Sequence, residues 1–139
     1  MTVRLNPYLT FRDSAREAME FYQSVLGGEL TRSTYGEFGM SQDPAEADKT
    51  MHAQLLTPGG LTLMASDVPA SVEHDTGSSI VISLSGEDEA ELRGYWTGLA
   101  QGATIEQELQ SAPWGDSFGM LQDRFGVTWM VNIAGPSEQ

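Results

Sequence analysis

The chain contains an internal repeat, in which AMEFYQSVLGGEL and ELRGYWTGLAQGATI follow the same pattern. A shift of 74 positions places Phe21 on Tyr95 and Gly28 on Gly102. Each copy has the pattern of a short amphipathic helix closed by glycine, with a strand before it and strands after it. Two copies of one unit in a short chain predict a duplicated fold with a cleft between its halves.

Length and composition restrict the class of protein. The 139 residues, 40% of them hydrophobic, suffice for one globular domain with its own core. The chain has no apolar run of about 18 residues and no signal-peptide pattern, so we expect a cytoplasmic protein without a membrane span. The absence of cysteine excludes disulfides, thiolate metal ligands and a cysteine nucleophile.

The net charge of −13 bears on the partners of the chain. Such a surface repels nucleic-acid phosphates and anionic membranes, so we expect neither as a partner. Its ordinary consequence is solubility.

Strict alternation predicts a strand over residues 3–11, with Asn6, Tyr8 and Thr10 on the face opposite the apolar side chains. Pro7 donates no amide hydrogen bond, which favours an edge strand. Ser14 and Glu17 have the spacing of a capping box at the start of a helix.

The remaining elements repeat this plan. In the first module we expect a helix over residues 14–26 and further strands over 29–35, 50–57 and 61–66. In the second we expect a strand over 79–85, a helix over 87–101 and strands over 104–110, 118–123 and 127–133. The order βαβββ, twice, predicts one α+β domain: module one at about 3–67, a connector at 68–77 and module two at about 78–134.

Five stretches resemble the PhnB-like branch of the vicinal oxygen chelate superfamily, which includes glyoxalases, bleomycin-resistance proteins and dioxygenases: NPYLTF, AREAMEFYQSVLGGEL, MHAQL, LTLMASD and PWGDSFGMLQDRFGVTWMVNI. The resemblance runs from about Leu5 to Ile133. It implies tandem βαβββ modules that form a curled mixed sheet around a cleft, the glyoxalase-like fold, and it implies homodimers. It implies no settled activity, and no motif here supports the methyltransferase label given to some such domains.

Metal-using members of this superfamily bind a divalent ion at four cleft-facing positions, on the first and last strands of both modules. Alternation places Asn6, Met64, Ser79 and Met130 at these positions. None of them is a strong ligand for a hard or borderline divalent ion. The sequence therefore predicts loss of the usual metal site, and we expect no cofactor.

The rest of the predicted cleft face mixes apolar and polar side chains. Methionine gives an adaptable apolar surface, and hydroxyls and amides give directed hydrogen bonds, as in many small-molecule pockets. The expected ligand-binding residues are Asn6, Tyr8, Thr10, His52, Gln54, Met64, Ser79, Val81, Trp114, Phe118, Met130 and Asn132. Trp114 and Phe118 have two readings: they stack on a ligand, or they pack within the protein or against a partner.

His52 alternates with Gln54 on the predicted cleft face. It is a candidate catalytic acid or base, or a hydrogen-bonding group for a substrate, because its ordinary pKa is near 6.5. The alternative is a hydrogen-bonded strand histidine without a role in chemistry. Asp67 and Asp123 end predicted strands, where we expect them to cap turns.

Three functions are compatible with these features. The first is a metal-independent protein that binds an unknown small molecule for sequestration or resistance. The second is a lyase or isomerase in which His52 acts as acid and base. The third is a structural or regulatory dimer without a ligand.

We expect a homodimer, because the edge strand that carries Pro7 needs covering and a two-fold pairing would cover it. Sedimentation should give a particle of about twice the 15.1 kDa chain mass. A 15.1 kDa particle at high protein concentration would count against the dimer.

Overall fold

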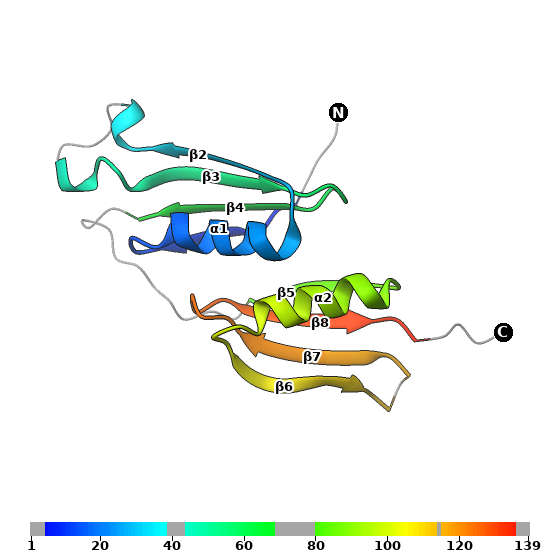
Figure 1. Ribbon diagram of the computed structural model, residues 1–139. Helices are drawn as coiled ribbons and strands as arrows, with labels where there is room; N and C mark the ends of the chain where they lie inside the picture. The colour runs from blue at the N-terminus through cyan, green and yellow to red at the C-terminus, as the bar shows by residue number, and fades with distance from the viewer. Residues whose placement is uncertain (1–4, 39–43, 69–79, 114, 136–139) are drawn as a thin grey trace. The chain divides into compact units, whose positions relative to one another are not determined.

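The computed structural model describes residues 5–38, 44–68, 80–113 and 115–135. The chain divides into two compact units, Met1–Asp75 (unit 1) and Thr76–Gln139 (unit 2). Each unit contains one four-stranded sheet and one α-helix (Figure 1). Within the described ranges, no helix has the length and apolar character needed to cross a membrane.

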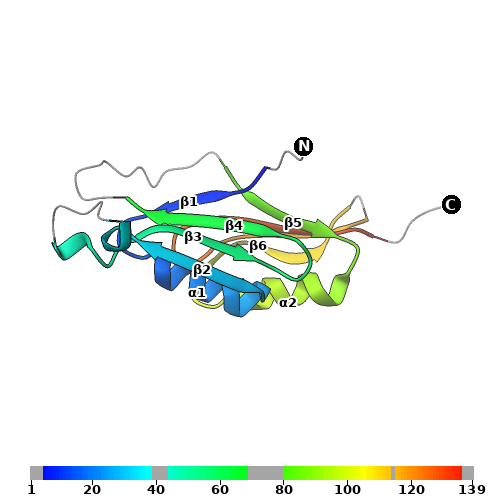
Figure 2. The same ribbon diagram turned by 90° about the horizontal axis from the view of Figure 1, so that it is seen from above.

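Unit 1 has the predicted βαβββ order. Its elements are β1 (Tyr8–Phe11), α1 (Ala15–Leu26), β2 (Glu29–Thr34), the 3-10 turns Gly36–Phe38 and Pro44–Glu46, β3 (Thr50–Leu56) and β4 (Thr62–Asp67). The sheet order is β1-β4-β3-β2, with β1 parallel to β4 and the other pairs antiparallel. Helix α1 packs against β2, β3 and β4, as Figure 2 shows from above.

Unit 2 repeats this connectivity. Its elements are β5 (Ile82–Gly86), α2 (Glu89–Leu99), β6 (Thr104–Ser111), β7 (Ser117–Gln122) and β8 (Thr128–Ile133). The sheet order is β5-β8-β7-β6, with β5 parallel to β8. The predicted α+β class and the duplicated βαβββ order are confirmed, whereas the division into one domain with a connector stays a prediction.

Burial alternates along β4 and β8, which are the last strands of the two units in chain order. Leu63 and Ala65 of β4 are buried on the side of α1, and Trp129 and Val131 of β8 are buried on the side of α2. The residues between them are half-buried. Because successive strand side chains point to opposite faces, each sheet has one face against its helix and one opposite face.

The repeat extends to the hairpin turns. Gly60 and Gly126 lie 66 positions apart and adopt φ values of 91° and 89°. Each donates its amide to the residue three positions earlier, Thr57 and Asp123, at 3.0 Å. A positive φ of this size is cheap only for glycine, so the same turn is built twice with the same residue.

Glycine is also required where α1 ends. Gly28 has a φ of 103°, and a Cβ at this position would overlap the Leu56 carbonyl oxygen and lie 2.7 Å from the Thr57 Cα. The backbone of the β3–β4 hairpin therefore approaches the helix end too closely for any other residue. Gly102, the predicted counterpart of Gly28, also has a positive φ, of 75°.

The predicted capping box is wrong. Ser14 is the N-cap residue of α1, but its side chain makes no capping hydrogen bond. The first helical amide, of Ala15, instead donates to Asp67 Oδ1 at 2.9 Å. Asp67 is only 2% exposed, and an ionised carboxylate is a stronger acceptor than a hydroxyl, so a distant residue supplies the cap.

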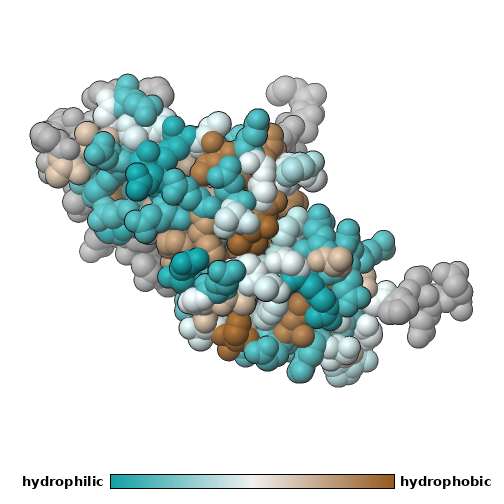
Figure 3. Space-filling model, in the orientation of Figure 1, coloured by the Kyte–Doolittle hydropathy of each residue, from teal (hydrophilic) through white to brown (hydrophobic). Residues whose placement is uncertain are grey.

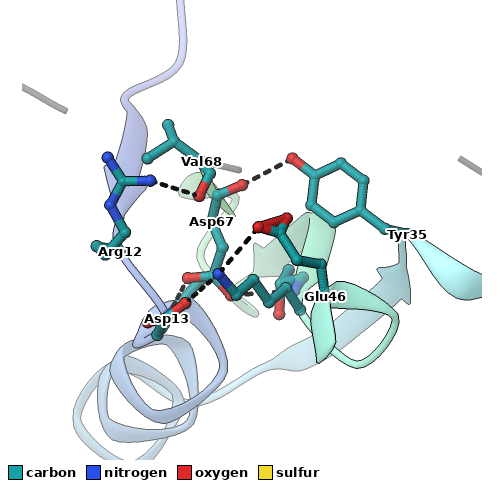
Figure 4. Close-up of polar contacts among 9 residues, drawn as sticks. Arg12, Asp13, Tyr35, Glu46, Asp67 and Val68 are labelled. Atoms are coloured by element: carbon teal, nitrogen blue, oxygen red, sulfur yellow. Dashed lines mark hydrogen bonds and ion pairs between the residues drawn. The ribbon is translucent and has the colours of Figure 1, made fainter. Parts of the chain in front are cut away.

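Asp67 joins three parts of unit 1 (Figure 4). Its Oδ2 atom accepts the Thr50 amide at 3.0 Å, at the start of β3. Its backbone carbonyl accepts the Tyr35 hydroxyl at 2.7 Å. Burial raises the pKa of Tyr35 above its ordinary value of 10.0, so this hydroxyl stays a donor at neutral pH. The expectation that Asp67 only caps a turn is therefore wrong.

A second contact closes the start of α1. Lys49 Nζ lies 2.6 Å from Asp13 Oδ1 and 3.6 Å from Glu46 Oε1. Asp13 has a positive φ of 73°, which is uncommon outside glycine. Lys49 thus ties the residues that precede β3 to the turn that precedes α1.

Several predicted boundaries shift. The first strand begins at Tyr8, although the Pro7 carbonyl still accepts the Met64 amide at 3.1 Å. Proline ends the ladder because it offers no amide in return. The second helix begins at Glu89, since Asp88 caps it by accepting the Glu91 amide at 3.0 Å.

Two glycine substitutions test the packing of unit 2. Gly94→Ala should raise the free energy of unfolding by about 1 kcal/mol, because Gly94 is exposed inside α2 and no surrounding atom lies within 4 Å of a Cβ built there. Gly119→Ala should lower it by about 1–3 kcal/mol, because its Cβ would lie 2.8 Å from Leu109 Cα and from Trp96 Cη2. Urea denaturation followed by circular dichroism measures both. Equal effects of the two substitutions would contradict this packing.

Candidate ligand-binding faces

The open face of unit 1 is the face of its sheet opposite α1. The ladder places Tyr8, Met64, Gln54 and Thr31 in one row across all four strands. Thr10 lies opposite Ser66 in the next row of β1 and β4. These residues are half-buried or exposed, and the sequence had placed Tyr8, Thr10, Gln54 and Met64 on one face.

His52 contacts Tyr8 on this face. The Tyr8 hydroxyl lies 3.3 Å from His52 Nδ1, and the ring centroids are 5.8 Å apart at an interplanar angle of 37°. The contact occupies Nδ1 and therefore fixes Nε2 as the ring nitrogen available to a bound molecule. No local sequence pattern indicates this contact, because the two residues are 44 positions apart.

The open face of unit 2 is the face of its sheet opposite α2. One row runs across the strands through Ser83, Met130, Met120 and Gln107. The next row runs through Ser85, Asn132, Phe118 and Gln110. Two methionines and a phenylalanine thus form an apolar patch on β7 and β8, and hydroxyls and amides flank it.

Asn132 is held in place by Asp116. Asn132 Nδ2 donates to Asp116 Oδ2 at 3.0 Å, and the Gly135 amide donates to Asp116 Oδ1 at 2.8 Å. The hydrogen bond from Asn132, followed by that from Gly135, lowers the pKa of Asp116 below its ordinary value of 3.8. A Cβ at Gly135 would overlap the Gly115 carbonyl, so the approach that forms this contact requires glycine.

Charge is almost absent from six of the eight strands, and the charged side chains of the other two are Glu29 and Arg32 of β2 and Glu106 and Glu108 of β6. Strands β1, β3, β4, β5, β7 and β8 contain no Lys, Arg or Glu, and their only Asp is Asp67, which lies on the helix side of its sheet. The titratable side chains on the open faces of these six strands are His52 and the phenol of Tyr8. In the part of the chain that the structure describes, no three His, Asp or Glu residues gather as a metal site would require.

The strand pairing also shows which of the predicted metal positions are equivalent in the two units. Tyr8 pairs with Met64 and Ser83 pairs with Met130, so Met64 and Met130 occupy equivalent places. Asn6 then corresponds to Val81 rather than to Ser79. Val81 is 38% exposed. Ser79 and Trp114 lie outside the described residues.

Asp123 behaves as expected for a turn residue. Its Oδ1 atom accepts the amides of Phe125 at 2.8 Å and Val127 at 3.1 Å. Its Oδ2 atom also accepts the indole N–H of Trp129 at 2.9 Å, a contact that the sequence did not indicate. These bonds fix the β7–β8 hairpin and thereby the positions of Met120 and Met130.

A family model described as the Glyoxalase/Bleomycin resistance protein/Dioxygenase superfamily matches residues 4–131. The chain belongs to this superfamily. Protein YjdN of Escherichia coli K12 is 31% identical in an alignment that covers 93% of this chain and 94% of YjdN.

Two solved structures resemble the chain along almost its whole length. Protein PA1353 of Pseudomonas aeruginosa is 38% identical, with a TM-score of 0.80 over 96% of this chain and 98% of PA1353. A PhnB protein of Bacillus cereus, described as a putative 3-demethylubiquinone-9 3-methyltransferase, is 28% identical, with a TM-score of 0.74 over 95% of this chain and 100% of that protein. The PhnB-like branch and the glyoxalase-like fold predicted from the sequence are confirmed.

The Asp116 contact gives a pH-dependent contribution to stability. Its pKa is lowered in the folded state, so the contribution is present above the ordinary value of 3.8 and is lost as the pH falls through the folded pKa. The difference in unfolding free energy between wild type and Asp116→Asn should be constant above about pH 5 and should shrink below about pH 4. Urea titrations at a series of pH values measure it. A difference that grows in acid would contradict the contact.

Proposed function

We propose that this chain binds a small organic molecule on its open faces, without a divalent metal ion, and releases it unchanged. The observation that carries the proposal is the composition of the two faces. They combine thioether, aromatic, hydroxyl and amide groups, and six of the eight strands that form them, all except β2 and β6, are almost free of charge. This is the chemistry of a pocket for an organic ligand with a few polar groups.

The side chains at the predicted metal positions are poor ligands for a divalent metal ion. Asn6 offers an amide oxygen, and Met64 and Met130 offer thioethers. Zinc prefers nitrogen, thiolate or carboxylate donors, and magnesium and calcium prefer several oxygens, of which some are charged. His52 is a single imidazole whose Nδ1 already meets Tyr8. These residues do not fit a tight divalent site, so no step of the proposed function involves one.

The charge distribution favours an uncharged ligand. The chain carries a net charge of −13, yet six of its eight strands, all except β2 and β6, carry a single charged side chain, Asp67, which lies on the helix side of its sheet. A buried ion without an opposite charge or sufficient hydrogen bonds is costly, because its lost hydration is not replaced. A neutral molecule with hydrogen-bonding groups avoids this cost.

The Tyr8–His52 contact supports a second candidate, a lyase or isomerase that uses His52. A hydroxyl at Nδ1 orients the ring and leaves Nε2 available to exchange a proton with a substrate, as general acid–base catalysis requires. In this case His52→Ala would abolish turnover of a substrate, whereas a binding protein returns its ligand unchanged. A ligand-free regulatory or structural dimer is the remaining alternative, and it would retain no small molecule at all.

Metal analysis tests the first part of the proposal. Protein purified without chelator should contain no stoichiometric zinc, nickel or manganese, because the donors described above bind these ions weakly. His74→Ala is the matched control for His52→Ala, since the chain has two histidines. One equivalent of metal that disappears in His52→Ala and persists in His74→Ala would overturn the proposal in favour of the enzyme.

Native mass spectrometry tests the second part. Protein taken directly from cells should carry a small organic molecule, and the mass of the molecule recovered after denaturation should be unchanged by prolonged incubation with the protein. Conversion of that molecule would contradict the binding function. Its conversion by wild type but not by His52→Ala would assign the chemistry to His52.

A further inference from the structure

The Asp116 contact determines which atom of Asn132 faces a ligand. Asp116 Oδ1 and Oδ2 each accept one hydrogen bond, from the Gly135 amide and from Asn132 Nδ2. An ionised carboxylate can only accept, so the amide nitrogen of Asn132 must point toward Asp116. The amide oxygen of Asn132 must then point the other way. No hydrogen bond to this oxygen occurs among the described residues.

The surroundings of Asn132 define a subsite. Asn132 lies between Ser85 on β5 and Phe118 on β7, and the Met120–Met130 pair lies in the adjacent row. An aromatic ring and two thioethers give an apolar surface that suits a flat ring. The Asn132 oxygen is a hydrogen-bond acceptor at the border of that surface.

We propose that Asp116 is a positioning residue, which fixes Asn132 as a hydrogen-bond acceptor and selects ligands with an apolar ring and an N–H or O–H donor. This inference rests on the proposed binding function and names the class of ligand for the unit 2 face. Asp116 itself acts only through Asn132. Without it the amide could turn and present its donor group to the ligand instead.

The variant Asp116→Asn should force the side-chain amide of Asn132 to turn in this way. Its side-chain oxygen can still accept the Gly135 amide, which places an NH₂ group where Asp116 Oδ2 meets Asn132. Two NH₂ groups cannot bond to each other, so Asn132 must turn its oxygen toward residue 116 and its NH₂ group toward the ligand. The double variant Asp116→Asn/Asn132→Asp restores an acceptor, because the carboxylate at 132 accepts from the amide at 116.

The test uses two isomeric probes, 3-methylindole, which has an N–H donor, and 1-methylindole, which has none. Binding is measured by the shifts of the backbone amide resonances of β7 and β8 during titration. Wild type should bind 3-methylindole about five-fold more tightly, the effect of one neutral hydrogen bond. The preference should vanish in Asp116→Asn and return in the double variant, which a merely structural role of Asp116 would not produce.

The ligand-free protein provides an independent readout. In wild type the side-chain NH₂ resonances of Asn132 should be protected from solvent exchange by the bond to Asp116, and in Asp116→Asn this protection should be lost. Equal binding of the two isomers to wild type, or unchanged Asn132 resonances in Asp116→Asn, would overturn the inference and leave the binding function standing. Failure of both isomers to bind, with the Asn132 signature intact, would overturn the ligand class while confirming the orientation of Asn132.

Discussion

Unit 1 depends most on the hydrogen bonds that the buried carboxylate of Asp67 accepts. It satisfies the first amide of α1 and the first amide of β3 with its two oxygens. A helix start and a buried strand start both leave amides that would be costly without a partner. One side chain at the end of β4 therefore fixes where α1 begins and how it lies on the sheet (Figure 4).

The consequence for function lies on the opposite face of the sheet. Once α1 is fixed on one face, the alternation of the strands commits Tyr8, Met64 and Gln54 to the other. The same holds in unit 2, where α2 commits Met120 and Met130. Hydrophilic (teal) and hydrophobic (brown) residues lie intermixed on the surface visible in Figure 3.

Pattern alone was sufficient to predict the elements and the faces. The period-two alternation around Met64 and Met130 and the glycines at 28, 60 and 126 are local signals, and a local signal is readable without coordinates. The prediction was wrong where a side chain distant in the sequence supplies the hydrogen bond that was expected from a local side chain. Ser14 has the spacing of a cap, but Asp67 is a better acceptor and arrives from 53 positions away.

The polar contacts of the candidate site could not be predicted for the same reason. Tyr8 and His52 were placed on one face, yet only the parallel pairing of β1 with β4 brings their rings together. The sequence predicts Asn132 as a ligand-binding residue, whereas its contact with Asp116 depends on the close approach of Gly115 and Gly135. No period or motif encodes such a contact.

The two repeat spacings show that the two units differ in one connection. The glycines after the helices are 74 positions apart, but those of the last hairpins are 66 apart, so the first copy holds eight more residues between these points. The additional residues lie between β2 and β3, in the segment that contains Lys49. Lys49 forms an ion pair with Asp13, just before α1. Unit 2 contains no lysine, so it cannot form the equivalent of this ion pair. The two units are therefore not interchangeable, and a chain built from two copies of unit 2 would lack the contact by which Lys49 holds the turn before α1.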